Sequence, residues 1–168
     1  MKKFIFVKSL FISVKYSPKL FALVLLLLVF VLGCAGGMSR TNKVNTIIQT
    51  ARSYTGTPYK FGGTTRAGID CSALLYHSFN SVNIKLPRVS EDQSKRGVKV
   101  KRNDLNVGDM VFFATGKKKR QVTHAGIVTA VRGKEVRFIH SSTSLGVTES
   151  NLSSAYYDKR FVRARRVL

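Results

Sequence analysis

The sequence predicts an α+β domain, in which helices come first and antiparallel strands follow. The first observation is a set of apolar residues at helical spacing near the start of the domain: Val44, Ile47, Ile48, Ala51 and Tyr54. The second is the apolar run 110–113, which is typical of a buried strand. The third is a pair of strand candidates separated by the turn 132–134. Helices followed by antiparallel strands indicate the α+β class.

Residues 1–33 have the layout of an export signal. They carry five lysines and no acidic residue, and they contain the uninterrupted apolar run 20–32. That run is shorter than the roughly 20 residues of a membrane-spanning helix. Directly after it, a small glycine precedes Cys34, so that segment 31–34 resembles the lipobox of bacterial lipoproteins.

The lipobox resemblance implies cleavage before Cys34 and attachment of lipid (palmitate) to that cysteine. We therefore expect a lipoprotein signal peptide over 1–33, the lipidated cysteine with a short polar tether over 34–43, and one folded domain over 44–168. The alternative is an uncleaved N-terminal anchor. With Cys34 assigned to lipid, Cys71 is the only other cysteine. An oxidising compartment tolerates an unpaired cysteine when it is buried or chemically needed.

The chain is strongly basic. It has 29 Lys+Arg and 8 Asp+Glu, for a net charge of +21. Removing 1–33 with its five lysines leaves 24 basic and 8 acidic residues, a net charge of +16. Such an excess favours anionic surroundings such as phospholipid head groups and wall polymers. Nucleic acid is not expected as a partner of an exported protein. The alternative interpretation is a soluble, self-repelling surface.

The first half of the domain continues with a loop and a capped helix. Segment 55–68 is rich in glycine and contains a proline, which predicts a long loop. Asp70 is then placed to cap a helix over 71–79. Pro87 closes the next connection, and a short polar helix is predicted over 90–96.

The second half is predicted to be a set of strands. A strand over 110–113 is followed by a basic turn at 116–120. Two further strands are predicted over 122–131 and 135–140. The segment 161–167 alternates apolar and basic residues, which is typical of an edge strand or a half-exposed strand.

Cys71 is the first candidate for a catalytic residue. It opens an apolar helical stretch after a glycine-rich segment. Backbone N–H groups and the partial positive charge at a helix start favour the thiolate form of a cysteine. The free N–H groups of Cys71 and Ser72 also suit the oxyanion of a tetrahedral intermediate. The alternative is that this lone cysteine packs as a small hydrophobic residue.

Two histidines downstream complete a nucleophile pattern. His124 interrupts an otherwise apolar strand, beside Gly126, which we expect to keep one face open toward a cleft. His140 ends the next strand, so a hairpin would make the two rings neighbours. One histidine would then act as the base and the other would hold its tautomer. The alternative for each is a structural histidine. His77 lies roughly 240° around the helix from Cys71 and is left out.

Six short motifs occur in order along the predicted domain. They are TPYKFGG at 57–63, GIDCS at 68–72, LPR at 86–88, GDMVFF at 108–113, HAGI at 124–127 and HSS at 140–142. Together they resemble the NlpC family of papain-like cell-wall cysteine peptidases. The closing stretch 144–168 resembles the murein DD-endopeptidase lipoproteins of that family in particular.

This resemblance implies a papain-like fold, in which N-terminal helices pack on a central antiparallel β-sheet. It assigns Cys71 as the nucleophile, His124 as the general base and His140 as the residue that orients the base. Tyr59 matches a tyrosine whose hydroxyl supports the oxyanion; the alternative is an aromatic side chain packed on the domain.

Three further residues are candidates for substrate binding: Asp70, Ser72 and Arg88. Asp70 either caps the helix, which we favour, or contacts the amine of a substrate peptide. Arg88 either binds a substrate carboxylate or forms a stabilising salt bridge. Ala73 stands where family members usually have glycine, and 88–90 replaces a more hydroxyl-rich run. We expect Ala73 to narrow the floor of the cleft.

The sequence thus predicts a murein endopeptidase that cleaves stem-peptide amide bonds through a Cys–His–His thioester mechanism. The expected bond is the D-alanyl–diaminopimelate cross-link. No cofactor is expected, and no metal site, since two histidines and one cysteine at these separations lack ligand spacing. The expected partners are peptidoglycan stem peptides and the membrane, reached through the N-terminal lipid, and we expect a monomer.

The expected location is the bacterial cell envelope. Gly36, rather than an aspartate, occupies the second position after Cys34, which favours the outer membrane. Alternative functions are a D-glutamyl–diaminopimelate endopeptidase, an amidase or acyltransferase on the same fold, and a non-catalytic lipoprotein that binds anionic polymers.

Overall fold

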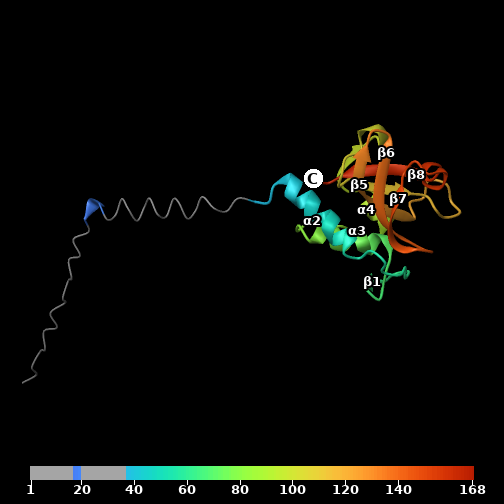
Figure 1. Cartoon of the computed structure of the whole chain (residues 1–168), viewed down its shortest axis with the longest axis horizontal. Coiled ribbons are helices and arrows are strands. Elements are labelled where there is room, and N and C mark those ends of the chain that lie inside the picture. Colours follow the sequence, from blue (N-terminus) through green and yellow to red (C-terminus); the bar gives the residue numbers. More distant parts are fainter. Residues whose placement is uncertain (1–16, 20–36) are drawn as a thin grey trace, which may run out of the picture. The chain divides into compact units, whose positions relative to one another are not determined.

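The computed structural model describes residues 17–19 and 37–168. Residues Met38–Leu168 form one compact unit, shown in Figure 1. Cys34 and almost all of the predicted signal peptide lie outside the described residues. Within the described part of the chain, no helix is both long and apolar enough to cross a membrane.

The first helix of the unit is α2 (Arg40–Arg52), which begins where Ser39 accepts a hydrogen bond from the backbone N–H of Asn42. Its buried face is formed by Ile47, Ile48 and Ala51. The prediction of a helix here is confirmed, but the helix begins four residues before Val44. The tether predicted over 34–43 is therefore wrong for residues 40–43, because the Ser39 cap starts the helix earlier than the apolar pattern does.

The second helix, α3 (Cys71–Asn80), is capped by Asp70 as predicted. The loop expected over 55–68 contains a small two-stranded sheet, β1 (Thr64–Thr65) and β2 (Gly68–Ile69), so that expectation is only partly right. The predicted polar helix over 90–96 is shorter, as α4 (Ser90–Gln93).

A six-stranded antiparallel sheet forms the rest of the unit, in the order β3-β8-β4-β5-β6-β7. Its strands are β3 (Val98–Val100), β4 (Met110–Phe113), β5 (His124–Arg132), β6 (Glu135–Ser142), β7 (Gly146–Asn151) and β8 (Phe161–Arg166). The 3₁₀ turn η1 (Arg102–Asp104) follows β3, and the short helix α5 (Ala155–Asp158) follows β7.

The structure corrects the predicted sheet at two points. Strand β8 lies between β3 and β4 and is therefore not an edge strand. Most of its residues are partly exposed, which agrees with the other predicted alternative, a half-exposed strand. The sequence analysis also missed β3, β7 and α5. Strand β7 is largely polar and half-buried, and β3 pairs with a strand more than 60 residues away, so neither has a clear local pattern.

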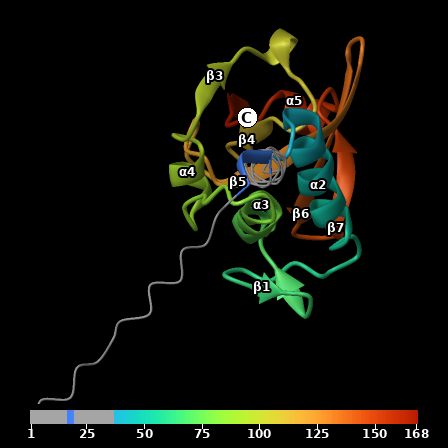
Figure 2. The same cartoon turned by 90° about the vertical axis from the view of Figure 1, so that its left-hand side faces the viewer.

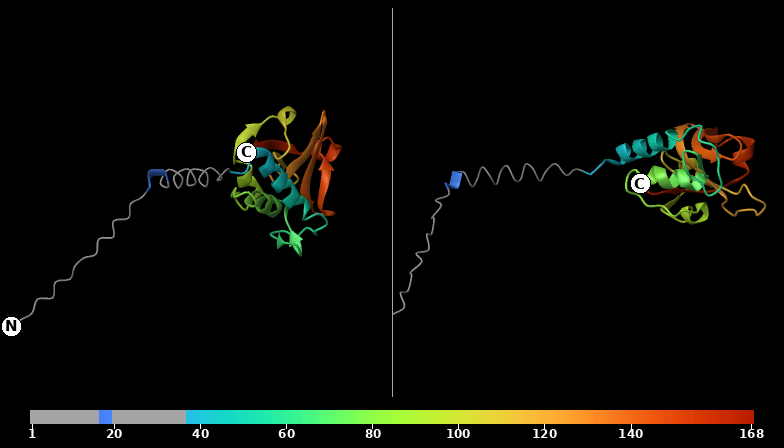
Figure 3. Two further views of the ribbon diagram at one scale, coloured as in Figure 1. Left: turned by 60° about the vertical axis from the view of Figure 1, so that its left-hand side comes forward. Right: turned by 90° about the horizontal axis from the view of Figure 1, so that it is seen from below.

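The sheet separates two apolar clusters. Helices α2 and α3 lie side by side on one face, as Figures 2 and 3 show, and the first cluster fills the space beneath them. The second cluster lies on the opposite face, around Phe113 and Phe138. Consecutive residues of β4 serve opposite clusters: Phe112 belongs to the first and Phe113 to the second. Strand β4 is therefore buried on both faces, as its apolar run predicted.

Gly126 has a different role from the one expected. A Cβ atom at this position would lie 2.5 Å from Cδ2 of Phe138 and 2.9 Å from the carbonyl oxygen of Ile139. The space beside this glycine is therefore filled by the Phe138 ring and does not open toward a cleft. The expectation of an open face was wrong, because a neighbour on β6 occupies it.

We predict that Gly126→Ala lowers the free energy of unfolding by about 1–3 kcal/mol, since an added methyl group overpacks the contact between β5 and Phe138. Urea unfolding of a chain containing residues 35–168 measures the change. Gly37→Ala is the matched control, because no atom lies within 4 Å of a Cβ there. Equal stabilities of the two variants would contradict the packing explanation.

Candidate active site

Cys71 is the first residue of α3, and only 6% of its surface is exposed. Burial raises the pKa of its thiol to about 11, although hydrogen bonds from the backbone N–H groups of Ala125, Ser72 and Cys71 itself act to lower it. The helix start therefore stabilises the thiolate as expected, but desolvation outweighs it. Desolvation thus favours the neutral thiol, in opposition to the thiolate that the helix start favours.

His124 and His140 are hydrogen-bonded neighbours, as the predicted hairpin required. His124 Nε2 lies 2.9 Å from His140 Nδ1, and the two ring planes are nearly perpendicular, at 84°. His124 opens β5, while His140 lies in β6 and is fully buried. This contact leaves Nδ1 of His124 without a hydrogen-bond partner among the described residues, so that nitrogen is the one available to a thiol.

Burial lowers the pKa of both imidazoles. The value falls to about 4 for His124, which is almost completely buried. It falls to about 3 for His140, where burial is the larger cause and the neighbouring His124 adds to it. A base must be unprotonated to accept a proton, and both rings are neutral above these values. His124 is therefore in the form that a base requires at neutral pH.

Two hydroxyl groups that the sequence analysis missed lie on the other side of His140. Ser150 of β7 and Tyr157 of α5 both contact its Nε2 atom. No motif marks either residue, and both lie in elements without a local pattern. Only a predicted hairpin that pairs β7 with β6 could have placed Ser150 near His140.

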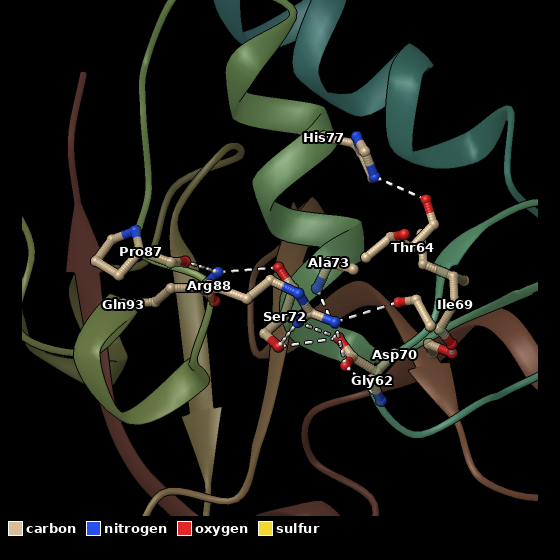
Figure 4. A network of polar contacts seen from close by, with 12 residues as sticks. Gly62, Thr64, Ile69, Asp70, Ser72, Ala73, His77, Pro87, Arg88 and Gln93 are labelled. Carbon is tan, nitrogen blue, oxygen red and sulfur yellow. Dashed lines mark hydrogen bonds and ion pairs between the residues drawn. The ribbon is translucent and has the colours of Figure 1, made fainter.

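A second polar network surrounds Asp70, and Figure 4 shows it. The Asp70 carboxylate accepts hydrogen bonds from the backbone N–H of Ala73 at 2.7 Å and of Gly62 at 3.1 Å. Arg88 donates to both of its oxygens, at 2.9 and 2.7 Å, and Ser72 donates at 2.9 Å. Burial alone would raise the pKa of Asp70, but the hydrogen bonds from Arg88, Ala73 and Ser72 together hold it below its usual value.

This network shows how the three substrate-binding candidates contact one another. Asp70 is the helix cap, and five hydrogen bonds occupy its carboxylate. Arg88 forms the stabilising ion pair, and its guanidinium also donates to the Ser72 hydroxyl at 2.7 Å. The three side chains line the space beside Cys71, but they bind one another. The ion pair is one of the two alternatives predicted for Arg88, while its contact with a substrate carboxylate stays a prediction.

Tyr59 lies in the same hollow as Cys71, and its backbone bridges to Ile69. Burial, together with the nearby Cys71 and Asp70, raises the pKa of its phenol. The hydroxyl is therefore a neutral donor at neutral pH. His77, by contrast, is engaged away from the site, where its Nε2 lies 2.9 Å from the carbonyl oxygen of Thr64 (Figure 4).

Cys71 and His124 line two separate hollows. The hollow around Cys71 has a volume of about 350 Å³ and includes Tyr59, Phe61 and Thr123 in its lining. The hollow around His124 has a volume of about 480 Å³, and the loop 142–145 forms part of its wall. Thr123 in the lining of the first hollow and His124 in the lining of the second are consecutive in the chain. Among the described residues, no group of three potential ligands could hold a metal ion.

This arrangement suits acyl transfer. A thiol at the start of a helix, an adjacent neutral imidazole and backbone N–H groups are the parts that such a reaction requires. Fold and site together define a cysteine peptidase, a hydrolase with an α+β domain. The chain belongs to the NlpC/P60 family, whose model matches residues 56–166.

Individual relatives support this assignment. The chain is 38% identical over 117 residues to a probable endopeptidase NlpC of Escherichia coli K12, covering 69% of this chain and 73% of that one. It is 37% identical over 123 residues to the murein DD-endopeptidase MepS/murein LD-carboxypeptidase of the same strain, covering 73% and 62%. A crystal structure of an NlpC/P60 family protein from Bacillus cereus matches with a TM-score of 0.66 and 31% identity, over 73% of this chain and 39% of that one.

We predict that iodoacetamide modifies Cys71 slowly at pH 7, and that the rate rises about tenfold per pH unit up to pH 10, because the thiol ionises only near pH 11. In a chain of residues 35–168, Cys71 is the single cysteine. The modified fraction is measured by mass spectrometry, with the same chain unfolded in urea as the control. A plateau of the rate below pH 8 would instead indicate a stable thiolate–imidazolium pair.

Proposed function

We propose that this protein is a murein endopeptidase that cleaves the D-alanyl–diaminopimelate cross-link between peptidoglycan stem peptides. The observation that carries the proposal is the contact of the Cys71 sulfur with the backbone N–H of Ala125, the residue after His124, which is itself hydrogen-bonded to His140. The family's relatives include a murein DD-endopeptidase. The proposal rests on the chemistry of Cys71, His124 and His140 and on that relationship.

The proposed mechanism is acyl transfer through a thioester. The Cys71 sulfur attacks the scissile carbonyl carbon while His124 accepts the thiol proton at Nδ1. The N–H groups at the start of α3 and the neutral Tyr59 hydroxyl donate to the oxyanion. The intermediate collapses, the amine leaves with the proton from His124, and a Cys71 thioester remains. Water, deprotonated by His124, then attacks the thioester and releases the carboxylic acid and the thiol.

The two hollows support the choice of a cross-link. Peptide continues on both sides of the scissile bond in a cross-link, so the site needs space on each side of the reacting atoms. The hollow around Cys71 and the hollow around His124 provide such spaces. Each has a highly exposed apolar side chain in its wall, Phe61 in the first and Leu145 in the second. A bond within one stem, such as D-glutamyl–diaminopimelate, remains the competing choice.

We expect the purified chain of residues 35–168 to convert cross-linked muropeptide dimers into monomers, while free tetrapeptides remain intact. Separation of the products by chromatography and mass spectrometry measures both reactions. Cleavage of tetrapeptides with intact dimers would favour the D-glutamyl–diaminopimelate bond. Transfer of an acyl group to an added amine, without net hydrolysis, would favour an acyltransferase.

Cys71→Ala is the control for this assay. It removes the nucleophile but little volume, so the folded unit should persist while conversion of the dimer is abolished. Substantial hydrolysis by the variant would contradict the mechanism. Binding of sacculi by the unaltered chain with no cleavage of any substrate would favour a non-catalytic protein that binds anionic polymers.

We propose further that the chain is a lipoprotein of the bacterial outer membrane, anchored through Cys34. The basic and apolar layout of residues 1–33 and the segment 31–34 support this proposal. Mass spectrometry of the protein from membranes should find a lipid-modified Cys34 as the first residue. If Cys34 is unmodified and residues 1–33 are still attached, the segment would instead be an uncleaved N-terminal anchor.

A further inference from the structure

His140 is held from both sides of its ring. Its Nδ1 atom lies 2.9 Å from His124 Nε2. Its Nε2 atom lies 2.9 Å from the Ser150 hydroxyl and 3.2 Å from the Tyr157 hydroxyl. Both ring nitrogens are therefore engaged, and the polar chain extends two residues beyond the proposed triad.

The sheet brings Ser150 to this position. Ser150 pairs with Phe138 across β6 and β7, and His140 pairs with Thr148. Residues two apart on a strand share a face, so Ser150 is a diagonal neighbour of His140. Adjacent Glu149 belongs to the opposite face, where its carboxylate bonds to Arg52 and Thr129. Among the described residues, the hydrogen-bond partners of His140 therefore include no carboxylate.

Tyr157, which lies in α5, packs against both imidazole rings. Its ring centroid lies 5.3 Å from that of His140 and 6.5 Å from that of His124, which it stacks upon at 20°. It also packs against Phe113 and Phe138 in the apolar cluster on that face of the sheet. Burial raises the pKa of its phenol, so the hydroxyl stays neutral at neutral pH. The ring fixes the hydroxyl beside Nε2.

Two hydroxyls on one nitrogen favour a single tautomer of His140. A bare ring nitrogen has one lone pair and accepts one good hydrogen bond, whereas an N–H can be shared between two oxygen acceptors. The two hydroxyls also form a hydrogen bond with each other, and both line the hollow around His124, so their hydrogens have acceptors other than Nε2 of His140. With the proton on Nε2, Nδ1 of His140 is an acceptor for the N–H of His124 Nε2.

We propose that Ser150 and Tyr157 are positioning residues that hold His140 in its Nε2–H form, so that the Nδ1 atom of His124 stays unprotonated and free to accept the Cys71 proton. The inference rests on the proposed function for the role of His124 as base. The opposite tautomer of His140 would donate from Nδ1 to His124 Nε2. It would thereby place the His124 proton on Nδ1, where no proton can be accepted.

The tautomer is measured directly by ¹⁵N NMR of histidine-labelled protein, without substrate. In the unaltered chain we expect a protonated Nε2 and an unprotonated Nδ1 for His140. In the double variant Ser150→Ala/Tyr157→Phe we expect a mixture of tautomers and a loss of kcat of roughly tenfold to hundredfold, with KM little changed. Ser150→Thr keeps a hydroxyl and should retain both the tautomer and most of the activity.

The controls remove hydroxyls elsewhere. Ser153→Ala loses a hydroxyl that contacts the carbonyl oxygen of Lys134, and Tyr76→Phe loses one in α3, with neither hydroxyl contacting His140. Both should leave the tautomer and kcat unchanged. Each single variant, Ser150→Ala and Tyr157→Phe, is measured as well, so that a double variant that fails to fold leaves the test intact.

A protonated Nδ1 on His140 in the unaltered chain would overturn the inference. So would an unchanged tautomer and kcat in the double variant, or in both single variants if the double variant does not fold. The NMR readout is independent of the substrate. Absence of murein cleavage by the unaltered chain, with His140 in the expected tautomer, would overturn the proposed function and not this inference.

Discussion

The Asp70 carboxylate is the constraint on which the rest of the site depends. It caps α3, and so fixes the residue that follows it, Cys71, at the first position of the helix. The same carboxylate binds the backbone of Gly62 and the guanidinium of Arg88. One buried charge thus ties together a loop, a helix start and the connection before α4. Removing Arg88 would leave the buried Asp70 charge without its ion-pair partner, which is costly.

Burial has a second consequence for the reacting groups themselves. The same desolvation that raises the pKa of Cys71 lowers the pKa of His124. Burial therefore favours the neutral form of both groups. The neutral state of His124 then makes its tautomer important, because only one of its two nitrogens can act as the base. The contacts of His140 bear on that choice.

Much of this protein is encoded in local sequence patterns. The start of α3, the buried strand β4 and the β5–β6 hairpin were all predicted, because capping, apolar runs and turn residues act within a few positions. The proximity of the His124 and His140 rings was predicted from that hairpin, and the structure adds the hydrogen bond between them. Strand β7 and helix α5 were missed, since polar half-buried segments are stabilised by neighbours distant in the chain. Ser150 and Tyr157 were missed with them.

The sequence by itself determined the α+β class, the cap on α3 and the identity of the cysteine and the two histidines, because each depends on residue type and short-range spacing. Tertiary structure alone decided that Arg88 pairs with Asp70, that Phe138 fills the space beside Gly126 and that burial raises the pKa of the Cys71 thiol. Each of these depends on which distant groups are packed together and on how much water they exclude. Desolvation and close packing are properties of the assembled fold, and no local pattern records them.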